Sequence, residues 1–119
     1  MNRYEAPAIM AREFPGAGSE LVFLSITGNI NKAMKLLAKY TGSLIESGKY
    51  NTVNKCMAVV DSMYEKGDLL VKNAIANEFV YYFSLMSLSC NKVEWHIVQA
   101  KIPFRLYSIY IKQSMQSAC

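Results

Sequence analysis

Residues 49–88, KYNTVNKCMAVVDSMYEKGDLLVKNAIANEFVYYFSLMSL, decide the fold, because they have the pattern of two amphipathic helices joined by a tight turn. Apolar residues recur at steps of three and four, which places them on one side of a helix. In the second half the apolar side is wide, so that helix needs neighbours on several sides. We therefore predict a helical hairpin of about 50–66 and 68–88, with its second helix at the centre of the fold. The apolar positions are Val53, Cys56, Met57, Val60, Met63 and Tyr64, followed by Val71, Ala74, Ile75, Phe79, Tyr82, Phe83 and Met86.

The predicted turn between the two helices is the dipeptide Gly67–Asp68. A glycine directly after a helix often takes the left-handed conformation, and we expect this at Gly67. An aspartate directly before a helix can accept hydrogen bonds from its first backbone N–H groups, and we expect Asp68 to be this N-cap. One helix therefore ends, and the next begins, within two residues.

Other segments also have helical spacing. We predict helices over 6–14, 29–46, 92–100 and about 103–115, and we find no strand pattern that competes with them. A chain of 119 residues is long enough for one hydrophobic core. The expected fold is therefore all-α: a single domain over 1–119, built as an array or bundle of five to six antiparallel helices.

Residues 19–46 allow two interpretations. Helical spacing continues through Gly28, so the segment can be one long helix in spite of the glycine. Alternatively, a separate short element precedes a helix that Thr27 or Asn29 caps. We favour a helix over 29–46 with a helical or irregular lead-in. The apolar residues that keep the spacing are Phe23, Ile26, Ile30, Ala33, Leu37, Tyr40, Thr41, Leu44 and Ile45.

Composition excludes several classes of protein. With 52% hydrophobic and 18% charged residues, the chain is too apolar to be disordered. No apolar run approaches the roughly 18 residues that a membrane span needs. The first residues have neither the apolar core of a secretory signal nor the acid-free pattern of a transit peptide. We therefore expect a cytoplasmic protein.

The positive charge is modest, at a net +4, but part of it is concentrated. Lys32, Lys35 and Lys39 share one face of the helix predicted over 29–46, and we interpret this as a solvated face. No recognisable nucleic-acid-binding module accompanies these lysines. We therefore expect no specific nucleic-acid partner, although contact with an acidic partner remains open.

The sequence offers few groups for catalysis or metal binding. His96 is the only histidine, and its neighbours Glu94 and Trp95 would not share its helical face. Zinc requires three or four Cys, His or carboxylate ligands at close spacing, and the chain lacks such a motif. We expect no enzyme activity, no metal and no cofactor.

Cysteines and clustered carboxylates have simple interpretations. Cys56, Cys90 and Cys119 cannot all pair within one chain, and we expect them to be reduced. Asp61 and Glu65 precede Asp68 at steps of four and three, and we interpret the three acids as a solvated helix end.

Polar and aromatic residues on two helices are the candidate partner-binding residues. Amides four residues apart on the central helix can line a groove or, buried, fix the pairing of two helices. The tyrosines cannot all be buried in so small a core, and Tyr is frequent in recognition surfaces. The candidates are Asn73, Asn77, Tyr81, Tyr82, Tyr107 and Tyr110.

Two resemblances support a helical fold. The hairpin at about 48–84 loosely resembles a tetratricopeptide unit, although a stable solenoid is expected to need at least three repeats. Residues 41–84 more closely resemble a family of small uncharacterised all-helical bacterial proteins, through Lys55–Cys56, Tyr64–Asp68 and Asn73–Phe79. These match the family patterns K-C, Y-x-x-G-D/N and N-A-I-x-N-x-F. The resemblance implies a helical architecture and a bacterial origin, and it transfers no catalytic residue.

The excess of apolar and aromatic side chains over what a small core can hide favours a binding function. We expect a non-enzymatic helical protein-interaction or scaffold module, with a protein or peptide partner or a second copy as a homodimer. The alternative is an immunity-type or regulatory partner protein. A small enzyme that uses His96 is the least favoured interpretation, and it requires a pocket with His96 beside a carboxylate or thiol.

Overall fold

A computed structural model describes residues 1–89 and 91–117, and every regular element in these ranges is helical. Because α5, η2 and α6 form one continuous helix, the described chain has seven helices and one 3₁₀ turn, η1. The predicted all-α class is confirmed. The expected five to six helices become seven because the lead-in before residue 29 is itself a helix. The elements are α1 (Glu5–Glu13), η1 (Pro15–Ala17), α2 (Glu20–Thr27), α3 (Ile30–Glu46), α4 (Tyr50–Lys66), α5 (Leu69–Ala74), η2 (Ile75–Val80), α6 (Tyr81–Ser89), α7 (Lys92–Lys101) and α8 (Phe104–Ser117).

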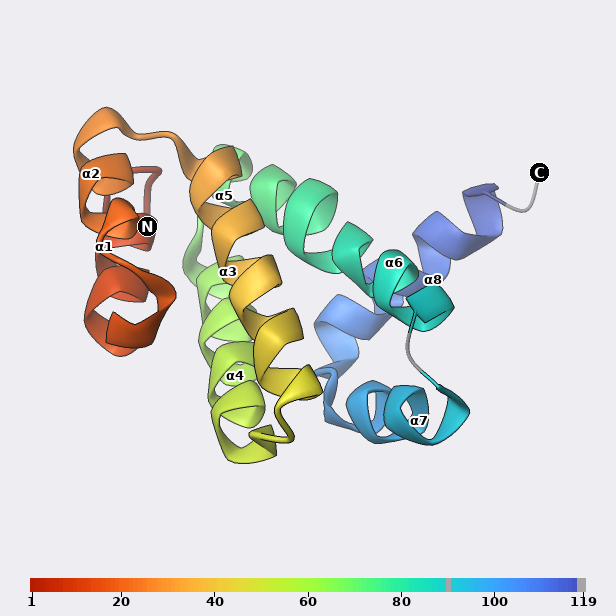
Figure 1. Ribbon diagram of the computed structural model, residues 1–119. Coiled ribbons are helices and arrows are strands. Elements are labelled where there is room, and N and C mark those ends of the chain that lie inside the picture. The colour runs from red at the N-terminus through yellow and green to blue at the C-terminus, as the bar shows by residue number, and fades with distance from the viewer. Residues whose placement is uncertain (90, 118–119) are drawn as a thin grey trace.

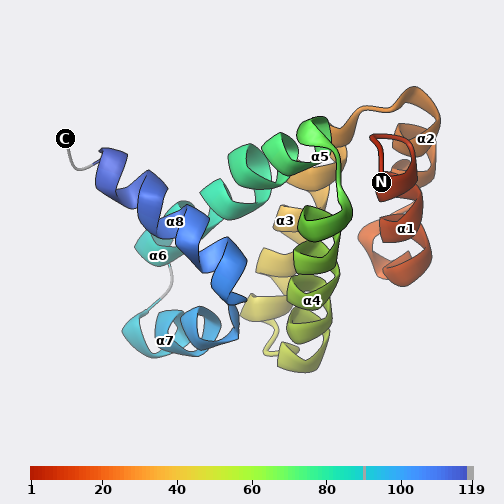
Figure 2. The same cartoon turned by 180° about the vertical axis from the view of Figure 1, so that it is seen from behind.

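The helices are arranged around the antiparallel pair α3 and α4 (Figure 1). Helices α1 and α2 lie along one side of this pair, and α7 and α8 lie on the other side, as the reverse view also shows (Figure 2). The long helix α5–η2–α6 meets α4 at the turn and then diverges from it. Its middle part packs against α3 and α8 instead. The predicted hairpin therefore forms, but its second helix has α3 as its main neighbour.

Gly28 and Asn29 decide the interpretation of residues 19–46 in favour of two elements. Gly28 is left-handed, with φ at 70°, and ends α2. Asn29 then caps α3 by accepting a hydrogen bond from the Lys32 N–H at 3.2 Å. The break rotates α2 out of the register of α3. The buried residues of α2 are therefore Leu21 and Leu24. The expected apolar face was therefore wrong in α2, where Phe23 and Ile26 are 62% and 73% exposed.

The turn at Gly67–Asp68 is confirmed in place but differs in conformation. Gly67 is extended, with φ at −76° and ψ at 153°, so the predicted left-handed conformation is wrong. Glycine is needed here for space, because an added Cβ would lie 2.6 Å from the Met63 carbonyl oxygen and 2.6 Å from the Val71 side chain. Asp68 caps α5 as predicted, since its Oδ1 accepts from the Val71 N–H at 3.1 Å.

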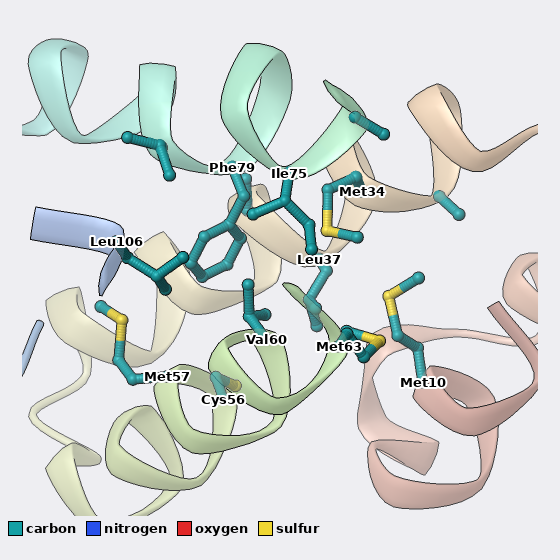
Figure 3. Close-up of a cluster of buried hydrophobic side chains, with 14 of the residues drawn as sticks. Met10, Met34, Leu37, Cys56, Met57, Val60, Met63, Ile75, Phe79 and Leu106 are labelled. Atoms are coloured by element: carbon teal, nitrogen blue, oxygen red, sulfur yellow. The ribbon is translucent and has the colours of Figure 1, made fainter. Parts of the chain in front are cut away.

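The long helix is irregular at its centre, which the sequence did not indicate. Residues 75–80 form η2, a π-helical segment whose hydrogen bonds span five residues instead of four. Gln113 of α8 donates from Nε2 to the Ala76 carbonyl oxygen in this segment, at 2.8 Å. The π segment also supplies the core residues Ile75 and Phe79, which point toward α3 and α4 (Figure 3). It is therefore the point where α3, α8 and the long helix meet.

Of the three acids predicted to form a solvated helix end, Glu65 and Asp68 are exposed and Asp61 is half-buried. Arg105 of α8 lies 3.9 Å from the Asp61 carboxylate and 3.6 Å from that of Glu65. Arg105 also donates to the Asp61 carbonyl oxygen at 3.3 Å. These contacts attach α8 to α4, whereas Asp68 serves as a cap.

Candidate functional site

Three lysines of α3 form one wall of the candidate site. Lys32, Lys35 and Lys39 are exposed on one face of the helix, as predicted, and we call them the lysine row. They extend over about 10 Å, because seven residues separate the first from the last at roughly 1.5 Å each. Lys32 pairs with Glu20 of α2 at 3.3 Å. Within the described residues, Lys35 and Lys39 have no ion pair, so their charges face solvent.

The long helix forms the opposite wall, and two hollows lie between the walls. The larger, about 550 Å³, is lined by the whole lysine row and by Glu20 and Glu78. The smaller, about 220 Å³, is lined by Tyr81, Tyr82 and Leu85 in addition to Lys35, Lys39 and Glu78. Because the two hollows share three residues, they form one depression between α3 and η2–α6, which we call the α3–α6 groove.

Gly42 lets the ring of Tyr82 lie directly against α3. A Cβ at Gly42 would lie 2.6 Å from the Tyr82 hydroxyl oxygen and 2.9 Å from ring atom Cε1. Real Cβ atoms do not approach other atoms this closely, so any other residue at position 42 would displace the tyrosine. Tyr82 is half-buried and lines the smaller hollow. The glycine thereby helps to set the shape of the α3–α6 groove.

An apolar strip continues from the groove along the outer side of α6. It consists of Tyr81, Leu85 and Leu88, which recur at steps of four and three on one helical face. Their exposed fractions are 54%, 48% and 86%. The site therefore combines a cationic wall, an aromatic floor and an exposed apolar edge.

The other residues predicted to bind a partner do not join this groove. Asn73 and Asn77 are exposed, so they do not fix helix pairing as buried amides. Tyr107 accepts a hydrogen bond from Gln99 Nε2 at 3.0 Å. Tyr110 packs its ring against Phe83, Trp95 and Tyr107. The structure thus brings Tyr81 and Tyr82 together at the groove, while Tyr107 and Tyr110 hold α7 and α8 in place.

His96 is exposed and lies in a separate shallow hollow of about 470 Å³. Among the described residues, the lining of this hollow contains no carboxylate and no thiol. The arrangement that a His96-based enzyme requires is therefore not found there. The other lining residues are Gln99, Ala100, Ile102, Phe104 and Tyr107.

Cys56 lies inside the core, where burial raises the pKa of its thiol and a contact with Thr41 opposes this shift. A neutral, enclosed thiol is unsuited to nucleophilic chemistry. Cys90 and Cys119 lie outside the described residues. In residues 1–89 and 91–117, no group of three or more His, Cys, Asp or Glu side chains is placed to hold a metal ion. The same ranges contain no helix with the length and apolar character that crossing a bilayer requires.

Glu78 and Gly42 belong to the site but were not predicted from the sequence. Glu78 has ordinary helical surface spacing, and Gly42 is a small residue within an apolar helical face. Their roles depend on the packing of α3 against the long helix, which no local pattern specifies. The lysine row was visible in the sequence, but the opposite wall was not.

Comparison with known proteins places nearly the whole chain in one family. The profile of a domain of unknown function, DUF7674, matches residues 7–116. No curated protein and no solved structure matches the chain. The predicted resemblance to a small all-helical family is confirmed. The match covers more of the chain than residues 41–84, which carry the resemblance. The chain belongs to the family of the domain of unknown function DUF7674.

Proposed function

We propose that this domain is a non-enzymatic protein-interaction module that binds a protein or peptide at the α3–α6 groove and the apolar strip. The observation that carries the proposal is the exposure of Tyr81, Leu85 and Leu88 on one face of α6, beside a hollowed surface. Contiguous exposed apolar side chains of this kind usually mark an interface.

The energy available from the strip fits a specific but reversible interaction. Full burial of a Leu side chain stabilises a complex by roughly 1.5–3 kcal/mol. Because the three side chains are on average more than half exposed, covering them would contribute on the order of 3–5 kcal/mol. Association costs offset part of this gain, so polar contacts with the lysine row are also needed.

The chemistry of the groove also favours binding over catalysis. Its described lining presents ammonium, carboxylate and phenol groups, and contains neither a histidine nor a thiol. Lys35 and Lys39 are exposed and have no ion pair among the described residues. Their ammonium groups are therefore placed to hold an anionic group of a partner.

The test compares the proteins retained by the immobilised domain and by two double variants. Tyr81→Ser with Leu88→Ser alters the strip, whereas Leu69→Ser with Leu70→Ser removes exposed leucines elsewhere as a matched control. We expect a protein from an extract of the source organism to be retained by the wild type and the control, but lost by the strip variant. Equal retention by all three would refute the proposal.

Light scattering on the same proteins tests a second copy as the partner. If the partner is a second copy of the domain, the molar mass of the wild type and of the control will double at high concentration, and that of the strip variant will not. Dimerisation that survives the strip substitutions would place the interface elsewhere.

A further inference from the structure

We propose that the partner presents an acidic amphipathic helix, and this inference rests on the proposed function of the same groove. The apolar side of the partner helix would cover Tyr81, Leu85 and Leu88, while its carboxylates would pair with the lysine row. A depression between two helices is a common receptor for an amphipathic helix.

The charge pattern of the groove matches such a helix in spacing. Lys32, Lys35 and Lys39 follow steps of three and four, so the row presents about one ammonium group per helical turn over about 10 Å. A partner helix that lies along the groove also presents one residue per turn, at roughly 5.4 Å. Lys35 and Lys39 have no ion pair within the described chain, so they can pair without breaking an existing contact.

The same surface is poorly suited to nucleic acid or to an anionic membrane. Glu78 lines both hollows from the wall opposite the lysines, and Glu20 pairs with Lys32 at one end of the lysine row. A nucleic-acid backbone carries a negative charge on every nucleotide. It would therefore place phosphate groups close to these carboxylates, which repel them. A helix can put its acids beside the lysines and a neutral polar side chain beside Glu78, so that this carboxylate is not buried against apolar groups. The hollowed shape also disfavours contact with a flat lipid surface.

The experiment selects partners from a display library of 20-residue amphipathic helices whose polar positions vary among Glu, Gln and Lys. We expect the enriched peptides to carry Glu at steps of three or four, next to a stripe of apolar residues. The affinity of the best peptide is then measured by fluorescence anisotropy on the full chain. Single-stranded RNA and phosphatidylglycerol vesicles are measured in parallel.

Substitutions in the groove give the decisive comparison. Lys35→Gln with Lys39→Gln should weaken binding of the selected peptide about fivefold to tenfold, since each of the two exposed pairs contributes at most about fivefold. Lys49→Gln with Lys112→Gln removes the same charge at exposed positions outside the groove and should change the affinity less than twofold. Glu78→Gln should strengthen binding about twofold to fivefold, because it removes a like charge. Circular dichroism confirms that each variant is folded.

The possible results separate this inference from the proposed function. Neutral or basic peptides that still depend on Tyr81 and Leu88 would overturn the acidic-helix inference and leave the interaction module intact. Peptides whose affinity depends on neither the lysines nor the strip would overturn the acidic-helix inference and the proposed function. An empty selection, or tighter binding of RNA or vesicles than of any peptide, would overturn the acidic-helix inference, while the retention experiment decides the proposed function separately.

Discussion

Gly42→Ala is the substitution that most sharply tests how the α3–α6 groove is built. In the interior of a helix, alanine is more stable than glycine by roughly 0.5–1 kcal/mol. Here the added Cβ would lie 2.6 Å from the Tyr82 hydroxyl oxygen, so the ring must move by about 1 Å to reach ordinary contact distance. The two effects have opposite signs and similar size.

A double-mutant cycle with Tyr82→Ala separates these effects. Displacing the ring costs about 0.5–1.5 kcal/mol for an unfavourable rotamer, and some packing is lost in addition. In the wild-type background we therefore expect Gly42→Ala to change the free energy of unfolding by between zero and about 1 kcal/mol of destabilisation. In the Tyr82→Ala background the clash is absent, and the same substitution should stabilise by about 0.5–1 kcal/mol. The predicted coupling energy is about 0.5–2 kcal/mol.

Urea unfolding at pH 7, followed by circular dichroism at 222 nm, measures each corner of the cycle. Gly48→Ala is the matched control, because Gly48 has φ at 71° and no heavy atom within 4 Å of an added Cβ. It should destabilise by about 1 kcal/mol in both backgrounds, since its cost comes from the left-handed backbone alone. If Gly42→Ala stabilised the protein equally with and without Tyr82, the contact that shapes the groove would be refuted.

Three further predictions concern the core, the turn and the buried thiol. Phe79→Ala should cost about 3–5 kcal/mol in urea unfolding, because Phe79 is 1% exposed, whereas Leu88→Ala should stay within about 0.5 kcal/mol; equal losses would contradict the core assignment. Asp68→Ala should cost about 1 kcal/mol and Asp68→Asn much less, because asparagine also caps a helix; similar losses in thermal unfolding would disprove the cap. In a Cys90→Ser, Cys119→Ser background, Cys56 should react with a disulfide reagent at pH 8 only as fast as the protein opens, and immediate labelling would show that it is accessible. Because burial raises its pKa, the native state holds the thiol proton more tightly than the unfolded state, so this group lowers stability as pH rises above about 8.5.

Helical periodicity was sufficient to predict the fold class and most helix positions. The predicted segments 29–46 and 92–100 differ from α3 and α7 by one residue at a single end. These segments could be predicted because each buries one face, and burial of one face imposes a spacing of three and four on the sequence. Caps add independent local signals, as at Asn29 and Asp68.

Features that depend on contacts between helices could not be predicted in the same way. The π segment at 75–80 keeps apolar residues at steps of four, so it resembles an α-helix in the sequence. Phe23 and Ile26 keep the spacing of α3, but the left-handed Gly28 turns their helix away from that register. The left-handed conformation predicted for Gly67 is common directly after a helix, whereas the limited space beside Met63 decides the role of this glycine.

The candidate site was predictable only in its parts. The lysine row follows directly from helical spacing. Tyr81 and Tyr82 are candidates because the tyrosines together are too many for a small core to bury. The lysines and tyrosines are joined by the packing of η2 against α3 and by the approach of Tyr82 to Gly42, which bring Glu78 and Tyr82 opposite Lys35 and Lys39. Sequence spacing within single helices contains no information about this pairing.

Backbone amide NMR of the ¹⁵N-labelled domain, titrated with the protein it retains from the source organism or with the selected peptide, tests the location of binding most directly. We predict that the largest shift changes fall within residues 32–39 and 78–88, and that they disappear in the Tyr81→Ser, Leu88→Ser variant. Shift changes concentrated on α7 and α8 around His96, or on Phe23 and Ile26 of α2, would show that partners bind a different surface.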